Sequence, residues 1–187
     1  LLRFLTPEQR STELEKAKVF LAELHANFPQ LLICHSNHGS MQYRRAKAHG
    51  IPVQMLKRYR DVLLPGIDSS GWAWRYAWRL QTALGPILFK HQAAGTPIAD
   101  AAHEQANLVV GHMHGTCGMD YAASSGRLYW ALTSGCLIDK DALAFAYGKH
   151  SKNKPIIACT VINDGVPYII PMLLDEDGRW VERTRAE

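Results

Sequence analysis

Long hydrophobic runs, Cys-x-x-Cys pairs and a large excess of one charge are all missing from this sequence, and each absence argues against a class of protein. No stretch approaches the roughly 18–20 uninterrupted apolar residues of a membrane-spanning helix, so no membrane span and no membrane partner are expected. The four cysteines form no Cys-x-x-Cys pair, which argues against a thiolate zinc knuckle. Lys and Arg number 21 against 17 Asp and Glu, and a net charge of +4 does not by itself indicate a nucleic-acid-binding protein.

The composition that remains is that of a chain with a sizeable core. With 187 residues, 47% of them hydrophobic, the sequence predicts a single domain over residues 1–187 and no long disordered tract. The cysteines are scattered singly through apolar runs, as small buried hydrophobic residues are, and this usage predicts a reducing, cytoplasmic environment. Histidine is the outlier, with nine residues.

Helices and strands alternate in the first part of the chain, and strands dominate the last part. Helices are predicted at residues 6–27, 41–49, 52–63 and 97–105, and strands at 31–34, 72–80, 87–89, 108–110, 128–132, 156–162 and 166–174. The first helix carries one apolar stripe, made of Ala17, Phe20, Leu21 and Leu24. The last two strands flank Asn163-Asp164-Gly165, a strong hairpin signal. This order predicts an α/β fold with α+β character, a layered αββα sandwich with mixed sheets.

An aromatic run occupies the predicted strand 72–80. Trp72, Trp74, Tyr76 and Trp78 fall at every second position, which is the period of a strand rather than of a helix. Such a stripe forms core or a subunit contact, or it offers rings on which nucleic-acid bases stack. The sequence leaves both interpretations open.

Three polar loops each follow a short apolar strand and carry a potential metal ligand. Asn37-His38 follow the first such strand, His91 follows the second, and His112 with His114 follow the third. Ligands of open α/β sheets gather beyond the carboxyl ends of the strands, so these side chains are expected to converge. Imidazole nitrogens bind Zn, Fe, Mn or Ni, and an amide oxygen adds a harder ligand.

The order of these loops resembles that of the calcineurin-like metallophosphoesterases. In that family the motif blocks run Asp-x-His, Gly-Asp-x-x, Gly-Asn-His-Asp/Glu, a single His, and Gly-His-x-His. The segments similar to the last three blocks are Ser36-Asn37-His38-Gly39, Lys90-His91 and Gly111-His112-Met113-His114. The resemblance covers about residues 31–135, and the later strands fit the C-terminal sheet of the family.

The resemblance implies a metal-dependent hydrolase of phosphate mono- or diesters, with a dinuclear centre of two divalent ions (Mn, Fe, Zn or Ni). It implies that Asn37, His91 and His112 hold one ion, that His114 binds the other, and that His38 is the catalytic residue that protonates the leaving oxygen. Two ions about 3.5–4 Å apart clamp the phosphate oxygens and turn a bridging water into hydroxide. A histidine suits proton donation because its ordinary pKa lies near neutral pH.

The sequence departs from the family pattern in its ligand set. No Asp-x-His and no Gly-Asp occur in the 187 residues, although the family places both before the third block. We therefore interpret the chain as the C-terminal portion of a larger domain whose N-terminal strands are missing, and expect it alone to bind metal weakly and to be nearly inactive. Gly39 stands where the family has an acidic residue and Ser36 where it has Gly, so another group must orient His38, with His35 a candidate.

A basic segment surrounds the Asn37-His38 loop. Residues 24–60 contain no Asp or Glu, and Tyr43 and Tyr59 are interleaved with the Lys and Arg residues there. Beside a dimetal centre such a segment would attract a nucleotide or nucleic acid, with Arg44 and Arg45 as candidate contacts to the substrate phosphate. A solvated helix face explains most of these charges equally well.

The expected substrate is thus a phosphorylated small molecule or a nucleic acid. The alternative, from a different class, is a non-catalytic binding module on the same fold that has lost its metals. About two metal ions per chain favour the enzyme, and none favours the module. The sequence does not specify the oligomeric state.

Overall fold

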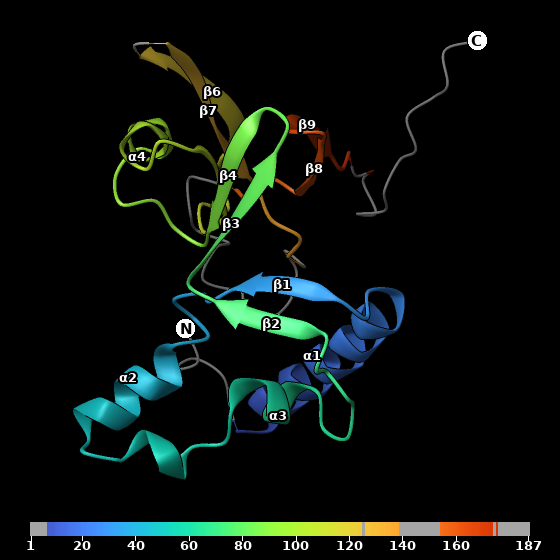
Figure 1. Cartoon of the computed structure of the whole chain (residues 1–187). Coiled ribbons are helices and arrows are strands. Elements are labelled where there is room, and N and C mark those ends of the chain that lie inside the picture. Colours follow the sequence, from blue (N-terminus) through green and yellow to red (C-terminus); the bar gives the residue numbers. More distant parts are fainter. Residues whose placement is uncertain (1–6, 125, 139–153, 174, 176–187) are drawn as a thin grey trace. The chain divides into compact units, whose positions relative to one another are not determined.

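The computed structural model describes residues 7–124, 126–138, 154–173 and 175, and Figure 1 shows their helices and strands. The chain divides into two compact units, the first ending at Trp78 and the second beginning at Arg79. Helices and sheets are both present, and the largest sheet is mixed, which confirms the α/β class. Among the described residues, no helix has the length and apolar content to cross a bilayer.

The first unit combines three helices and a 3-10 turn with a two-stranded sheet. Its elements are α1 (Pro7–Asn27), β1 (Leu31–Cys34), α2 (Met41–Ala48), η2 (Val53–Met55), α3 (Tyr59–Leu63) and β2 (Trp72–Arg75). Strands β1 and β2 are parallel, with Leu31 opposite Trp72 and Cys34 opposite Arg75. The predicted helices at 6–27 and 41–49 and the predicted strand at 31–34 are therefore confirmed.

Trp72 joins α1 to the small sheet. Its side chain is 3% exposed, its indole Nε1 donates to the Phe28 carbonyl at 2.8 Å, and its ring lies 5.4 Å from that of His25. The stripe predicted for α1 is only partly correct, because Phe20 is 57% exposed. Phe20 lies about 60° around the helix from Ala17, at the edge of the predicted stripe.

Two predicted elements are interrupted in the structure. The helix predicted at 52–63 splits into η2 and α3, because Leu56 and Arg58 both adopt extended backbone. The strand predicted at 72–80 splits into β2 and β3 (Ala77–Thr82), which belong to different sheets. The break falls at Tyr76, whose side chain is 80% exposed. Period-two alternation therefore identified extended chain correctly but did not show where the chain leaves the first sheet.

Gly71 is the residue on which the start of β2 depends. The Leu31 N–H donates to its carbonyl at 3.1 Å, and a Cβ at this position would overlap the carbonyl oxygen of Pro29. We expect Gly71→Ala to lower the free energy of unfolding by about 1–3 kcal/mol, as overpacking does, in urea titrations followed by tryptophan fluorescence. Gly95→Ala is the control, because a Cβ there meets nothing within 4 Å. Equal stability of the two variants would contradict this close approach.

The second unit is built on a five-stranded sheet in the order β3-β4-β5-β7-β6. Its further elements are β4 (Gly85–Lys90), α4 (Pro97–His103), β5 (Asn107–Val110), β6 (Cys117–Ser124), β7 (Arg127–Ser134), β8 (Ala158–Asn163) and β9 (Val166–Pro171). Strands β4, β5 and β7 are parallel neighbours, whereas β6 runs antiparallel to β7. The sequence analysis predicted no strand at β6, whose apolar alternation is weak.

Both faces of the five-stranded sheet are covered. On one face Ile87, Val109, Trp130 and Leu132 form a buried cluster against Ile162 and Ile169 of the β8-β9 hairpin. Residues of the alternate register point to the other face, where α4 packs on β5, β6 and β7. In Figure 1, α4 and the hairpin flank this sheet. The hairpin turn has φ of 49° at Asp164 and 87° at Gly165, which confirms the predicted turn.

Candidate metal centre and the Asn37-His38 loop

The ends of β4 and β5 bring two of the predicted ligands to one edge of the sheet. These strands are parallel, and Lys90 lies opposite Val110 at their carboxyl ends. The chain continues into His91 from one strand and into Gly111-His112 from the other. Two short, mostly apolar strands that run in the same direction thus deliver two imidazoles to the same edge of the sheet, as the sequence predicted.

His91 and His112 lie in direct contact. Nε2 of His91 is 3.2 Å from Nδ1 of His112, and the rings meet nearly edge to face, with centroids 5.0 Å apart and planes at 77°. Both side chains are half-buried. Two nitrogens bound about 2.0–2.1 Å from one ion, on adjacent corners of a tetrahedron or octahedron, lie about 2.8–3.4 Å apart. The observed separation of 3.2 Å lies within that range, and it is also a hydrogen-bond distance between the two rings.

The backbone at His112 is strained. Its φ is 67°, in the left-handed region that non-glycine residues rarely adopt, although His tolerates it better than most. The three-residue turn centred on His112 is closed by a hydrogen bond from the Met113 N–H to the Gly111 carbonyl at 2.8 Å. Strain of this kind persists where the surrounding structure imposes it and clusters at functional sites.

His114 is held through its backbone. Its carbonyl accepts the Ile156 N–H at 2.8 Å, and the Cys136 thiol lies 3.9 Å from the same oxygen. Within the part of the chain that the structure describes, no three His, Cys, Asp or Glu side chains are grouped as metal ligands. The structure thus brings His91 and His112 together and anchors His114 on the same loop. Burial raises the pKa of the Cys117 and Cys136 thiols, so both stay protonated near neutral pH.

A cluster of three charged side chains, Lys90, Asp100 and Glu104, is centred on the residue before His91 and was not predicted from the sequence. Lys90 Nζ lies 2.9 Å from a carboxylate oxygen of Asp100 and 2.9 Å from Oε1 of Glu104. Asp100, 5% exposed, also accepts the Ala94 N–H at 3.1 Å. Burial disfavours the Lys90 ammonium, but its hydrogen bonds to the two carboxylates outweigh that effect and raise its pKa. The cluster ties the end of β4 and the loop after His91 to α4.

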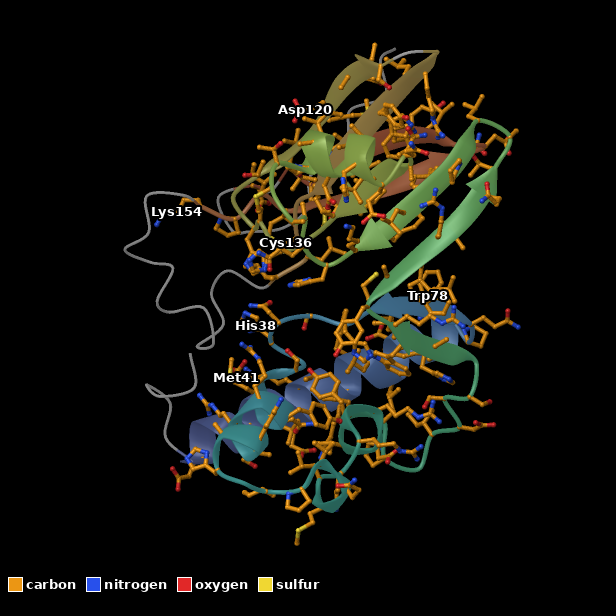
Figure 2. The ribbon with its side chains drawn as sticks, turned by 60° about the vertical axis from the view of Figure 1, so that its left-hand side comes forward. His38, Met41, Trp78, Asp120, Cys136 and Lys154 are labelled. Atoms are coloured by element: carbon orange, nitrogen blue, oxygen red, sulfur yellow. The ribbon has the colours of Figure 1, made fainter. Side chains whose placement is uncertain are left out.

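The predicted site residues of the first unit lie in a compact loop between β1 and α2. Ser36 Oγ accepts the Gly39 N–H at 2.9 Å, and Ser40 Oγ donates to the Asn37 carbonyl at 3.1 Å. Ser40 occupies the N-cap position of α2, but its side chain makes no capping hydrogen bond to the helix. His38 is exposed, and Figure 2 shows it with Met41 where the loop enters α2. Ser36, which departs from the family pattern, thus stabilises the loop.

Other side chains near this loop have identifiable contacts. Arg44 Nη2 donates to the Asn37 carbonyl at 2.7 Å, so this candidate phosphate contact also holds the loop. Arg45 is exposed on α2. The His35 ring packs against Tyr76 at 5.1 Å between centroids, which is the contact the structure gives for the residue considered as a partner of His38.

Comparison with known proteins adds no relative, since no protein family, curated protein or solved structure matches the chain.

Proposed function

We propose that the chain is part of a dimetal phosphoesterase that hydrolyses phosphate mono- or diesters, with nucleotides or nucleic acid as substrates. The observation that carries the proposal is the 3.2 Å approach of His91 Nε2 to His112 Nδ1 beyond two parallel strands. The order of the three polar loops along the sequence supports it, through the resemblance to calcineurin-like metallophosphoesterases.

The proposed roles follow the chemistry of each side chain. His91 and His112 hold one divalent ion, and His114 binds a second, whereas Asn37 as a further ligand stays a prediction from the sequence. When bound, such a pair supplies a Lewis acid for the phosphate oxygens and a hydroxide near neutral pH. Lys90, through Asp100 and Glu104, fixes the chain next to His91. The ions are Mn, Fe, Zn or Ni, which imidazole and amide ligands accept.

His38 is the proposed proton donor. Its imidazole is exposed, so it can exchange its proton with solvent between turnovers. Its loop is fixed by the Ser36–Gly39 hydrogen bond and by Arg44, which limits the positions that the ring can take. Protonation of the leaving oxygen by such a group contributes about 10²–10⁴-fold to the rate.

The test is the activity of the full polypeptide encoded by the gene, loaded with Mn²⁺ and assayed on p-nitrophenyl phosphate and bis-p-nitrophenyl phosphate. We expect His38→Gln to lower kcat by about 10²–10⁴-fold and to remove one limb of the pH profile. His49→Gln is the control, because His49 is also exposed and ends α2, with its Nδ1 2.8 Å from the Arg45 carbonyl. Equal activities of the two variants would refute the role of His38.

Metal analysis of the same polypeptide separates the enzyme from a binding module. About two divalent ions per chain support the proposed function, and none after loading contradicts it. Residues 1–187 alone are expected to bind metal weakly and to turn over little substrate, so full activity of this chain would show that its ligand set is already complete.

A further inference from the structure

A cavity of about 610 Å³ lies in the first unit, and the proposed metal ligands of the second unit do not use it. Its walls come from the end of β1, the loop that carries His38, α2, residues 58–60 and β2. The volume falls within the roughly 300–1,000 Å³ of pockets that bind small molecules. Such a cavity therefore has room for a ligand of nucleotide size.

The walls of this cavity are unusually aromatic. Its lining includes the His35 imidazole and five tyrosine and tryptophan rings, those of Tyr43, Tyr59, Trp72, Trp74 and Tyr76. Trp72 is buried, and its ring lies 5.9 Å from that of Trp74, so the two indoles support each other. Tyr76 and Tyr59 are 80% and 42% exposed and form accessible parts of the lining. A planar ligand would find ring faces on which to stack.

The charges at the cavity are positive. Arg58 and Arg60 line it, and no Asp or Glu occurs among its described lining residues. Arg58 pairs with Asp61 at 2.8 Å, whereas Arg60 Nε is 4.0 Å from Asp61 and its guanidinium lies over the Trp74 ring, 5.9 Å from the centroid. Aromatic boxes bind quaternary ammonium groups, but two guanidinium groups repel such a ligand. The lining instead suits a planar ring that carries a negative charge.

We propose that this cavity, the base pocket, binds a nucleotide whose base stacks on Trp74 and Tyr76 and whose phosphate contacts Arg60. The nucleotide is either free or part of a single strand, since both present the same base and phosphate. Ser36 and Gly39 line the pocket and flank Asn37-His38, which places a bound nucleotide next to the loop of the proposed proton donor. The inference deepens the proposed function by assigning the cavity in which its nucleotide substrate binds, and the link to hydrolysis rests on that function.

The pocket is tested by calorimetric titration of the chain in EDTA, so that no metal takes part. Adenosine 5′-monophosphate is the probe, with adenosine and ribose 5-phosphate as its two halves. We expect each half to bind at least about 10-fold more weakly than the whole nucleotide, because each lacks one of the two contacts. An oligothymidylate that binds more tightly than the mononucleotide identifies a single strand as the source, and the reverse order identifies free nucleotides.

Variants assign the binding to this pocket. Tyr76→Ala removes a ring that is 80% exposed, so the fold should be unaffected. We expect this variant to weaken the binding of the mononucleotide by about 5- to 150-fold. Arg60→Ala should weaken the binding of the mononucleotide by about 10-fold and leave the affinity for adenosine unchanged. The controls are Tyr121→Ala on β6, also an exposed ring, and Lys47→Ala on α2, outside the lining.

The outcomes separate this inference from the proposed function. Mononucleotide binding that survives both Tyr76→Ala and Arg60→Ala in folded protein overturns the base pocket, as does octanoate binding as tightly as the nucleotide. His112→Ala should leave nucleotide binding in EDTA unchanged, because it removes a proposed metal ligand. Nucleotide binding without hydrolysis by the metal-loaded full polypeptide overturns the proposed function alone.

Discussion

We expect His112→Ala to abolish metal-dependent hydrolysis by the full polypeptide and to weaken the cobalt binding of that polypeptide by more than about 100-fold. His112 Nδ1 is one of the two nitrogens that fit a shared ion, and its loss leaves His91 without that partner. Residues that only orient metal ligands already change affinity by about 10–100-fold, so removing a ligand should exceed that range. The measurement is a Co²⁺ titration followed by visible absorption, because protein-bound Co²⁺ absorbs more strongly than Co²⁺ in solution.

The backbone at His112 requires a second variant. At a φ of 67° an alanine keeps a Cβ in the left-handed region, whereas glycine adopts it freely. His112→Gly therefore removes the imidazole without backbone strain, and both variants should lose cobalt to the same extent. His103→Ala, at an exposed position at the end of α4, is the control. Retention of wild-type cobalt affinity by His112→Gly would show that the pair does not bind metal.

The convergence of His91 and His112 was predictable because it depends on local sequence and one topological rule. Two short apolar runs, each followed after one residue by histidine, predict buried parallel strands, and parallel strands end at the same edge. The structure confirms both strands and their direction. The register brings the two histidines to the same edge of the sheet, whereas the turn at His112, with its φ of 67°, was not predicted.

Other parts of the fold depend on contacts between distant residues and leave no local signal. Lys90 is 10 residues from Asp100 and 14 from Glu104, and the sequence predicts a helix there without indicating which of its faces meets β4. The chain leaves its first sheet at Tyr76, in the middle of an unbroken alternation of aromatic residues. Strand β6 went unpredicted because its pairing with β7, rather than a strongly apolar pattern, specifies it.

The base pocket also combines a feature that the local sequence predicts with one that depends on contacts between distant residues. The alternation of Trp72, Trp74 and Tyr76 predicted rings on one face, and the sequence left open whether they are core or a stacking surface. In the structure Trp72 is buried as a core residue would be, whereas Tyr76 is 80% exposed. The cavity itself depends on how residues 58–60 and the His38 loop pack around β2.

The second large effect is expected at Asp100, where Asp100→Ala should lower the free energy of unfolding by about 3–5 kcal/mol. The Asp100 side chain is 2% exposed, and its loss leaves Lys90 with a single carboxylate partner and the Ala94 N–H without its acceptor. Removing one member of a buried ion pair has a cost of this size, because the remaining charge stays desolvated. Urea unfolding followed by tryptophan fluorescence measures the change.

Glu104→Gln is the matched control, since its side chain is 36% exposed and its ion pair should be worth at most about 1 kcal/mol. The pH dependence follows from Lys90, whose pKa is raised in the folded chain. Its stabilising contribution is complete below the unfolded value of about 10.4 and is lost as pH rises through the higher folded value. The wild type should therefore lose stability in that alkaline range, and Lys90→Met should lack this step.

Because Lys90 directly precedes His91, Asp100→Asn should also weaken cobalt binding by about 10–100-fold, which a purely structural role for the cluster would not produce.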